Sequence, residues 1–387
     1  MARKSGIGAD LAGASRLAIE AVKGVTELVE AVHMNVLNKA IGPRLAGPVS
    51  GVTGLVYRSV KGVTRLVGGG IDTVLGRLVP ELGEPASWPG REALVAALNG
   101  VLGDRLAATN NPLAIQMRWR QGGLPLSVTA PTGRILVLAH GLCMNDVQWL
   151  RGGVDHGATL ASERGYTPVY LHYNSGRHVS ENGRDFAQQL QALVDGWPVP
   201  VQELVIIGHS MGGLLARSAC HYGAQAGHGW LSYLSKIVFL GTPHHGAPLE
   251  RGGNWVHLLI DVSAYSAPFA RLAKIRSAGI TDLRHGSVID DDWDGQDRFA
   301  HGVPLPQMVA LPAGVRCYAI GATIGKREGD LADRLLAGDG LVPLASALAE
   351  HADPARTLDF ERHVVYQTNH MQLLSSPEVS ERLLAWL

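Results

Sequence analysis

The chain has 387 residues, of which 46% are hydrophobic and 18% are charged, and its formal net charge at pH 7 is zero. This composition is that of a globular protein and excludes a disordered chain. Because there is no net positive charge to attract nucleic acid, we expect no nucleic-acid partner. The three cysteines, Cys143, Cys220 and Cys317, are too few and too widely spaced for a disulfide framework or a zinc site.

The first residues begin like a secretory signal, with Arg3 and Lys4 close to the N-terminus, but no apolar core follows. The charged residues Asp10, Arg16 and Glu20 interrupt the stretch. Nor does the chain contain a run of 18 apolar residues, the pattern typical of a membrane-spanning helix. We therefore expect a cytoplasmic protein, with peripheral attachment to a membrane or granule left open.

Residues 1–80 predict an amphipathic helical hairpin. Valines spaced three and four residues apart form one stripe between residues 22 and 36 and another between residues 49 and 78. The segment also carries ten Lys/Arg and five Asp/Glu, a net charge of +5. We expect it to pack on the rest of the protein or on a second subunit. The alternative is a segment that lies on a lipid surface and brings the protein there.

Residues 81–110 predict a linker and a first helix, and residues 111–387 predict one α/β domain. In the second range, short apolar runs alternate with helical patterns such as those at 183–195 and 214–222. The predicted strands are residues 135–139, 167–171, 203–207, 236–240, 315–320 and 363–366. Apolar strands separated by helices are typical of a mostly parallel sheet with helices on both faces.

The strongest motif is Gly-His-Ser-Met-Gly-Gly at residues 208–213. It directly follows the predicted strand 203–207 and precedes a helix that begins near Leu214. A G-x-S-x-G sequence in this strand–turn–helix context holds the serine on a tight turn at the carboxyl edge of a sheet. There the positive end of the following helix faces developing negative charge. We predict that Ser210 is a nucleophile.

A serine nucleophile needs a general base, and the base needs an acid that orients it. In folds with this turn, the acid and then the histidine follow on loops after later strands. His370 comes directly after the last predicted strand and is our candidate base, whereas His363 lies inside that strand. Asp339, flanked by glycines in residues 338–343, is the candidate acid.

Two backbone N–H groups are predicted to bind the oxyanion that forms during acyl transfer. One belongs to Met211, directly after the nucleophile, and the other to Leu142, in the loop after strand 135–139. The candidate substrate-binding residues are His140, His209, His244, His245 and Trp255. For His244 and His245, a role in shaping the rim of the site is the alternative.

Together these motifs resemble the bacterial lipases and esterases of the α/β-hydrolase superfamily. The resemblance covers about residues 110–387 and rests on residues 139–141, 208–213, 241–244, 338–343 and 369–370. It implies the α/β-hydrolase fold and hydrolysis of a small or lipid-like carboxylic ester through an acyl-enzyme on Ser210, with no cofactor. An acyltransferase or another acyl-bond hydrolase with the same three residues stays open. A function of another class also stays open: a protein that coats a lipid body or polyester granule through residues 1–80.

The strand pattern lapses between about residues 247 and 312, where apolar helical residues predict a lid over the serine. Within this insertion, the acidic loop at residues 290–297 begins like a calcium-binding EF-hand loop. Its twelfth position is His301, however, and not the glutamate that such a loop requires. The sequence therefore favours a solvated acidic loop, and we expect no metal site.

Overall fold

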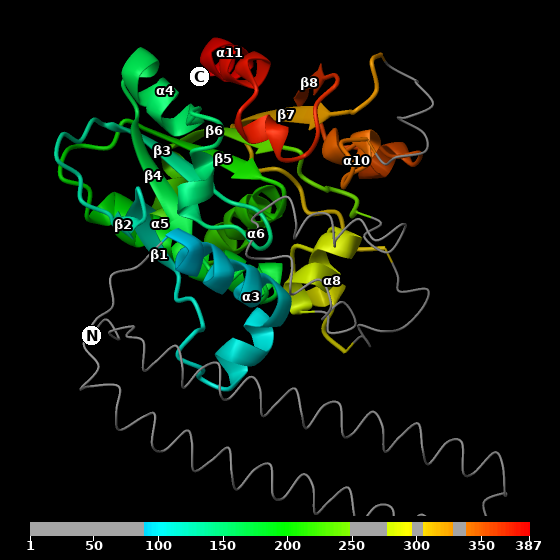
Figure 1. Ribbon diagram of the computed structural model, residues 1–387, viewed down its shortest axis with the longest axis horizontal. Coiled ribbons are helices and arrows are strands. Elements are labelled where there is room, and N and C mark those ends of the chain that lie inside the picture. Colours follow the sequence, from blue (N-terminus) through cyan, green and yellow to red (C-terminus); the bar gives the residue numbers. More distant parts are fainter. Residues whose placement is uncertain (1–88, 248–276, 296–304, 328–337) are drawn as a thin grey trace, which may run out of the picture. The chain divides into compact units, whose positions relative to one another are not determined.

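The computed structural model of the protein describes residues 89–247, 277–295, 305–327 and 338–387 (Figure 1). The predicted helical hairpin at residues 1–80 lies outside the described residues. So does most of the predicted lid, including Trp255. The predicted first helix is α3 (Pro89–Ala108). Within the described ranges, no helix is both long enough and apolar enough to cross a membrane.

The described residues form a sheet of eight strands, which is mostly parallel, as the sequence predicts; six of the strands were predicted. The strands are β1 (Arg118–Gln121), β2 (Leu124–Pro125), β3 (Arg134–Ala139), β4 (Thr167–His172), β5 (Glu203–His209), β6 (Leu234–Leu240), β7 (Arg316–Ala322) and β8 (Glu361–Val365). Their order in the sheet is β2-β1-β4-β3-β5-β6-β7-β8. Strands β3 to β8 are parallel to their neighbours, whereas β1 pairs antiparallel with both β4 and β2.

Strand β5 lies in the interior of the sheet between β3 and β6. In its register with β3, Val205 pairs with Leu136 and Gly208 pairs with Ala139. The apolar residues 204–207 are fully buried, because neighbouring strands cover both edges and helices cover both faces. Packing against the neighbouring strands and the helices therefore holds the carboxyl end of β5 in position.

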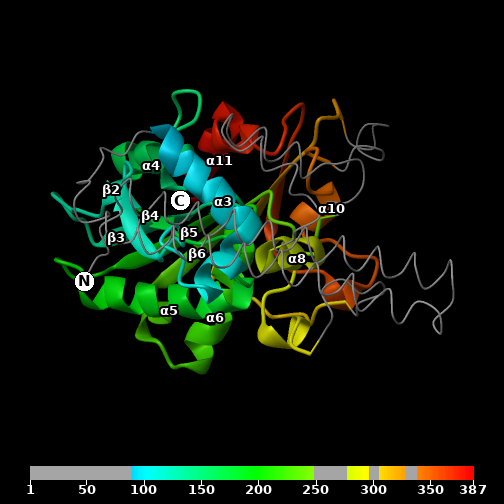
Figure 2. The same ribbon diagram turned by 60° about the horizontal axis from the view of Figure 1, so that its bottom comes forward.

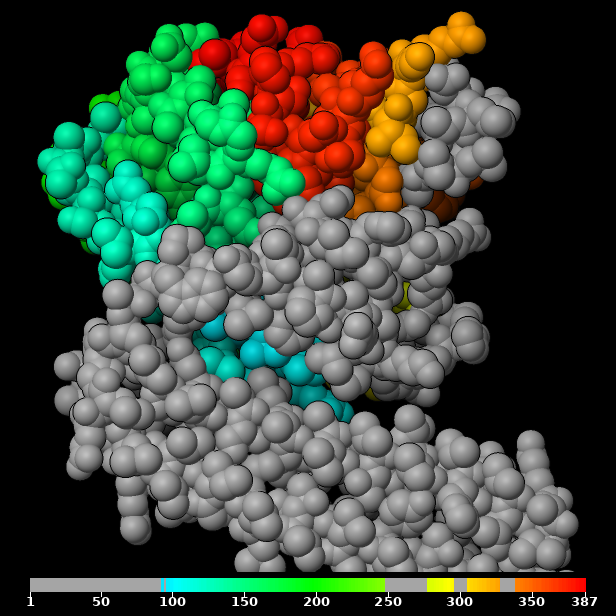
Figure 3. Space-filling model, viewed as in Figure 1, coloured from blue at the N-terminus to red at the C-terminus, as the bar shows by residue number. Residues whose placement is uncertain are grey.

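Helices cover both faces of the sheet, as predicted. They are α4 (His156–Arg164), α5 (Val179–Asp195), α6 (Met211–Gln225), α8 (Ala278–His285), α10 (Leu344–Ala347) and α11 (Pro377–Trp386). Helices α5 and α6 lie on one face, and α4 and α11 lie on the other (Figure 2). The space-filling view shows α11 (red) beside α4 (green), where the Arg164 guanidinium donates to the Leu384 carbonyl at 2.7 Å (Figure 3).

Helix α3 contacts the loops that follow β3 and β4. The Asn174 amide donates to the Gly103 carbonyl at 2.9 Å, and the Cys143 Sγ lies 3.8 Å from the Ala97 carbonyl oxygen. The Ser277 hydroxyl, just before α8, donates to the Gly100 carbonyl at 2.7 Å. These contacts place α3 at the carboxyl edge of the sheet, with the body that carries the candidate site.

Candidate functional site

Ser210 occupies a strained turn between β5 and α6. Its φ is 55° and its ψ is −122°, a conformation that residues with a side chain rarely adopt. Such a conformation costs on the order of 1–3 kcal/mol and persists only where the surroundings impose it. Here the Ser210 N–H donates to the Leu240 carbonyl at 2.8 Å, and the Gly213 N–H donates to the Ser210 carbonyl at 3.1 Å. The neighbouring strand and the first turn of α6 thus hold the serine in place.

Position 212 of the motif requires glycine for a steric reason. A Cβ at Gly212 would lie 2.8 Å from the His140 carbonyl oxygen and 2.7 Å from the Ala139 carbonyl carbon. Both are backbone atoms at the end of β3, so they cannot move aside at small cost. The turn at residues 208–213, which carries Ser210 and is called the elbow below, can approach the loop after β3 only because Gly212 has no side chain.

Asp339 and His370 form a buried hydrogen-bonded pair, as the predicted acid–base pairing requires. The His370 Nδ1 lies 2.6 Å from Asp339 Oδ2, and the two residues are 2% and 1% exposed. The second carboxylate oxygen of Asp339 accepts the backbone N–H groups of Leu341 and Val342 at 2.9 and 2.8 Å. In addition, the His370 N–H donates to the Asp339 carbonyl at 3.1 Å. Both side chains are therefore fixed in orientation.

The glycines on either side of Asp339 allow this geometry. Gly338 has a φ of 64° and Gly340 a φ of 94°, both in the left-handed region that favours glycine. With these two turns the loop folds back, so that the Asp339 carboxylate meets N–H groups of its own loop on one side and His370 on the other. Because a carboxylate only accepts, the His370 Nδ1 carries the proton, and its Nε2 keeps the lone pair that a general base needs.

The structure also brings His370 next to the elbow. The His209 Nε2 lies 3.2 Å from the His370 carbonyl oxygen, and the centroids of the two rings are 4.7 Å apart. His209 directly precedes Ser210. The predicted nucleophile, base and acid thus come from the turn after β5, from the loop after β8 and from the loop before α10.

The two predicted oxyanion donors belong to residues next to Ser210 in the chain and next to a glycine that packs against it. Met211 is the first residue of α6, where backbone N–H groups have no partner within the helix and the helix dipole is positive. Leu142 follows Gly141, at which a Cβ would lie only 3.0 Å from the Ser210 Cβ. Gly141 therefore packs against the Ser210 side chain, and the role of the Leu142 N–H stays a prediction.

The loop that carries Leu142 is held by a group that the sequence prediction did not include. The Cys143 N–H donates to the Ser175 hydroxyl at 3.0 Å, and Cys143 has a φ of 63°. Ser175 is 1% exposed and follows the end of β4, the neighbour of β3. Carboxyl ends of adjacent parallel strands meet at one edge, and this rule could have identified residues 174–176 from the sequence.

A buried charged cluster anchors the far end of the same loop. The Asp146 carboxylate accepts the Gly123 N–H at 2.9 Å and lies 3.3 Å from the Arg120 guanidinium and 3.4 Å from His172. Burial alone would raise the pKa of Asp146, but His172 and Arg120 more than offset it and lower the pKa. Arg120 also pairs with Glu92 of α3 at 2.8 Å. The charge on Asp146 is thereby compensated inside the protein.

The four predicted substrate-binding histidines in the described residues occupy different surroundings. His140 and His209 are fully buried, and burial lowers the pKa of His140 to about 3, so its ring is neutral. His244 lies 4.8 Å from the Phe239 ring and 5.2 Å from the Phe360 ring, measured between centroids. His245 is half-buried near His351. Three of the four thus pack inside the protein, and Trp255 lies outside the described residues.

The acidic loop is bonded to the protein and is not simply solvated. The Asp292 carboxylate accepts the N–H groups of Val288 and Gln307 at 2.9 and 2.8 Å, and Asp290 pairs with Arg184. Among the described residues, no three His, Cys, Asp or Glu side chains converge as metal ligands would. The acidic side chains here therefore order this segment against α5.

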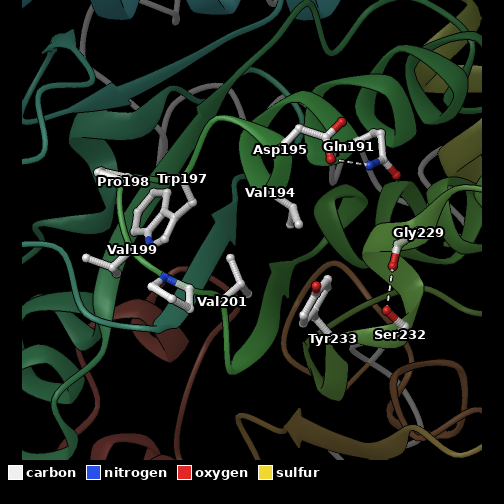
Figure 4. Close-up of a pocket in the computed structure, with 11 residues that line it drawn as sticks. Gln191, Val194, Asp195, Trp197, Pro198, Val199, Val201, Gly229, Ser232 and Tyr233 are labelled. Carbon is white, nitrogen blue, oxygen red and sulfur yellow. Dashed lines mark hydrogen bonds between the residues drawn. The ribbon is translucent and has the colours of Figure 1, made fainter.

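A cavity of about 550 Å³ lies at the opposite end of the sheet (Figure 4). It is bordered by Trp197, Val201 and Tyr233, residues that follow α5 or precede β5 and β6. Two of its polar side chains bond to each other: the Gln191 amide donates to the Asp195 carboxylate at 2.7 Å. This cavity contains none of the predicted site residues.

Comparisons with known proteins found one matching domain family and several similar solved structures. A model of the PGAP1-like α/β domain matches residues 131–309, less than half of the chain. A Bacillus licheniformis lipase in its mature form is similar at 18% identity, with a TM-score of 0.42, over 70% of this chain and 98% of that chain. The Pyrococcus furiosus esterase Pf2001 is similar at 13% identity, with a TM-score of 0.40, over 70% and 82%. No curated protein matches the sequence.

The fold class follows from the topology described above, together with the matched PGAP1-like α/β domain. The strand order, the antiparallel first hairpin and the serine turn between β5 and α6 are those of an α/β-hydrolase fold. The matched domain includes Ser210 and Leu142 but ends before Asp339 and His370. The placement of the last two residues therefore rests on the geometry described above.

Proposed function

We propose that the protein is a serine hydrolase that cleaves carboxylic esters through an acyl-enzyme on Ser210. One observation carries this proposal: a serine held at φ 55° at the start of a helix, next to a buried Asp339–His370 pair that leaves the His370 Nε2 free to accept a proton. Nucleophile, base and orienting acid in this relation are the requirements for acyl transfer.

In the first half of the reaction, the Ser210 oxygen attacks the ester carbonyl carbon and its proton moves to the His370 Nε2. The carbonyl oxygen becomes an oxyanion, which the N–H groups of Leu142 and Met211 bind. The intermediate then collapses: the bond to the alcohol oxygen breaks, and His370 gives its proton to the departing alcohol. The acyl group remains on Ser210 as an ester.

In the second half, water attacks the acyl carbon and passes a proton to His370. The bond from the acyl carbon to the Ser210 oxygen breaks, His370 returns the proton to that oxygen, and the carboxylic acid leaves. Asp339 stays ionised throughout, since its role is to hold the imidazole in the Nδ1–H tautomer and to stabilise the imidazolium. No cofactor takes part in these steps.

The test is covalent labelling with a fluorophosphonate, together with hydrolysis of p-nitrophenyl esters of increasing acyl length. We expect labelling of the wild type, no labelling of Ser210→Ala, and a loss of about 10³-fold or more in kcat in that variant. Ser232→Ala, which removes an exposed hydroxyl bonded to the Gly229 carbonyl, is the matched control and should behave as wild type. Labelling that survives Ser210→Ala would refute the proposal.

The same assay separates hydrolysis from acyl transfer. If a competing alcohol captures most of the acyl group in the presence of excess water, the protein is an acyltransferase with the same acyl-enzyme. Release of free acid in proportion to the alcohol leaving group indicates a hydrolase, which is the result we expect.

A further inference from the structure

His209 links the nucleophile to the base in the described structure. It is fully buried, and its Nε2 lies 3.2 Å from the carbonyl oxygen of His370. It was a candidate substrate-binding residue in the sequence, yet an imidazole with no exposed surface does not offer itself to a substrate. Its contacts are with the protein: the His370 backbone, and the Trp149 ring at 6.5 Å between centroids.

The direction of this hydrogen bond defines the chemical state of His209. A carbonyl oxygen only accepts, so the His209 Nε2 carries the proton and Nδ1 carries the lone pair. Nδ1 is buried and has no hydrogen-bond partner among the residues that the structure describes. Burial, followed by the nearby His370, lowers the pKa of His209 well below its usual range. The ring is thus neutral, with one fixed tautomer.

Three hydrogen bonds position His370, and they come from two residues. Asp339 accepts from the His370 Nδ1 at 2.6 Å and from its backbone N–H at 3.1 Å. These two bonds tie His370 to the acid loop, and neither of them joins it to the segment that carries Ser210. The bond from His209 supplies that link, because His209 is the residue directly before Ser210.

We infer that His209 is a positioning residue, whose Nε2–H bond to the His370 carbonyl sets the distance between the base and Ser210. This inference rests on the proposed function, since it concerns how the same reaction is set up. His209 does not touch the reacting atoms. Losing its bond should therefore act through misplacement of His370, which for shifts of about 1 Å costs on the order of 10²-fold in rate.

The test compares His209→Leu, which has no donor, with His209→Gln, whose side-chain amide can still donate to the carbonyl. We expect His209→Leu to lower kcat by about 10- to 100-fold with KM within about 2-fold of wild type. We expect His209→Gln to recover kcat to within about 3-fold. Fluorophosphonate labelling of Ser210 should slow in the same proportion, because it also depends on the base.

His156→Leu is the matched control. His156 is also fully buried, and its Nε2 also lies at hydrogen-bond distance, 3.0 Å, from a backbone carbonyl oxygen, that of Leu373. This variant should lose stability and keep its kcat. Equal losses of kcat in His156→Leu and His209→Leu, or equal losses in the Leu and Gln variants at 209, would overturn the inference.

A measurement on the wild type keeps the inference testable if His209→Leu does not fold. Nitrogen-15 spectra of histidine-labelled protein at pH 7 should show His209 as a neutral Nε2–H tautomer with a slowly exchanging proton. An Nδ1–H tautomer or a charged ring would overturn it. A wild type without labelling or ester hydrolysis would contradict the proposed function instead, so the two failures are distinguishable.

Discussion

The two ends of strand β5 differ in whether their polar groups are hydrogen-bonded and in whether their backbone is strained. At the amino end, the Glu203 carboxylate contacts the Arg134 guanidinium at 2.9 Å, the Ser235 hydroxyl at 2.7 Å and the Tyr166 hydroxyl at 3.1 Å. At the carboxyl end, Ser210 is in a strained conformation, and the described part of the chain offers the buried His209 Nδ1 no hydrogen-bond partner.

We interpret this difference as a division of roles along β5, in which the amino end contributes to stability and the carboxyl end to function. Satisfied polar groups in relaxed conformations contribute to folding, whereas buried unpaired groups and strained backbone are costs that persist where function requires them. Within the described ranges, three further buried polar atoms without a hydrogen-bond partner lie around the same end: His140 Nε2, Thr242 Oγ1 and His244 Nε2. We therefore expect substitutions at the carboxyl end to affect mainly activity, and those at the amino end mainly stability.

The largest effect should come from Asp339→Asn. An asparagine amide in this position no longer favours the Nδ1–H tautomer of His370, so the base would lose its acceptor nitrogen. We expect kcat for a p-nitrophenyl ester to fall by about 10³- to 10⁴-fold, with the melting temperature reduced only modestly. Ester hydrolysis by the folded variant at more than a tenth of the wild-type rate would exclude Asp339 as the orienting acid.

A smaller loss of activity should follow from Ser175→Ala, which removes the acceptor for the Cys143 N–H. We expect about a 10-fold lower kcat, because the loop that carries Leu142 loses one hydrogen bond worth about 1 kcal/mol or slightly more. Binding of a boronic acid, which mimics the tetrahedral intermediate, should weaken by a similar factor.

Ser218→Ala is the control for this prediction. Its hydroxyl is also buried and also makes one bond to the backbone, to the Val288 carbonyl at 2.6 Å. This variant should lose stability without losing boronic acid affinity. If both serine variants weaken the inhibitor equally, Ser175 has no particular role at the oxyanion loop.

At the amino end of β5, we expect substitutions to change stability and not activity. Burial alone would raise the pKa of Glu203, but hydrogen bonds from Ser235 and Arg134 overcome it and lower the pKa to about 2. Since the folded-state pKa lies below the unfolded value of 4.5, this carboxylate stabilises the protein fully above about pH 4.5. That contribution is lost as the pH falls towards about 2.

Glu203→Gln tests this contrast. We expect it to lower the free energy of unfolding by about 1–3 kcal/mol at pH 7 and to leave kcat unchanged. Urea titrations at several pH values should also show a weaker loss of stability below pH 4.5 than in the wild type. A drop in kcat without a loss of stability would contradict the claim that the amino end of β5 contributes mainly to stability.

The sequence predicted most of the sheet because its strands are buried on both faces. Six apolar runs became β3 to β8 with boundaries within a few residues, and the serine turn fell where predicted. Hairpin β1–β2 was missed, since its residues 118–121 are mostly polar and carry no apolar run. Helix α4 was also missed, with few apolar residues to mark its inner face.

The candidate site was predicted to a similar extent, and for a similar reason. Asp339 was recognisable from its flanking glycines, which the two left-handed turns require. The strand rule places residues 174–176 near this loop, but the bonds from Cys143 to Ser175 and from His209 to His370 could not be found in this way, because each joins segments that are far apart in the sequence. A single histidine or serine in the sequence carries no sign of the backbone group it will bond to.

The central claim is tested most directly by trapping the acyl-enzyme. Wild-type protein mixed with excess p-nitrophenyl acetate, quenched in acid within the first turnover and digested, should yield a peptide that carries one acetyl group on Ser210. The Ser210→Ala variant should yield none. Turnover of the ester by the wild type without an acylated Ser210, or with the acyl group on another residue, would contradict the account.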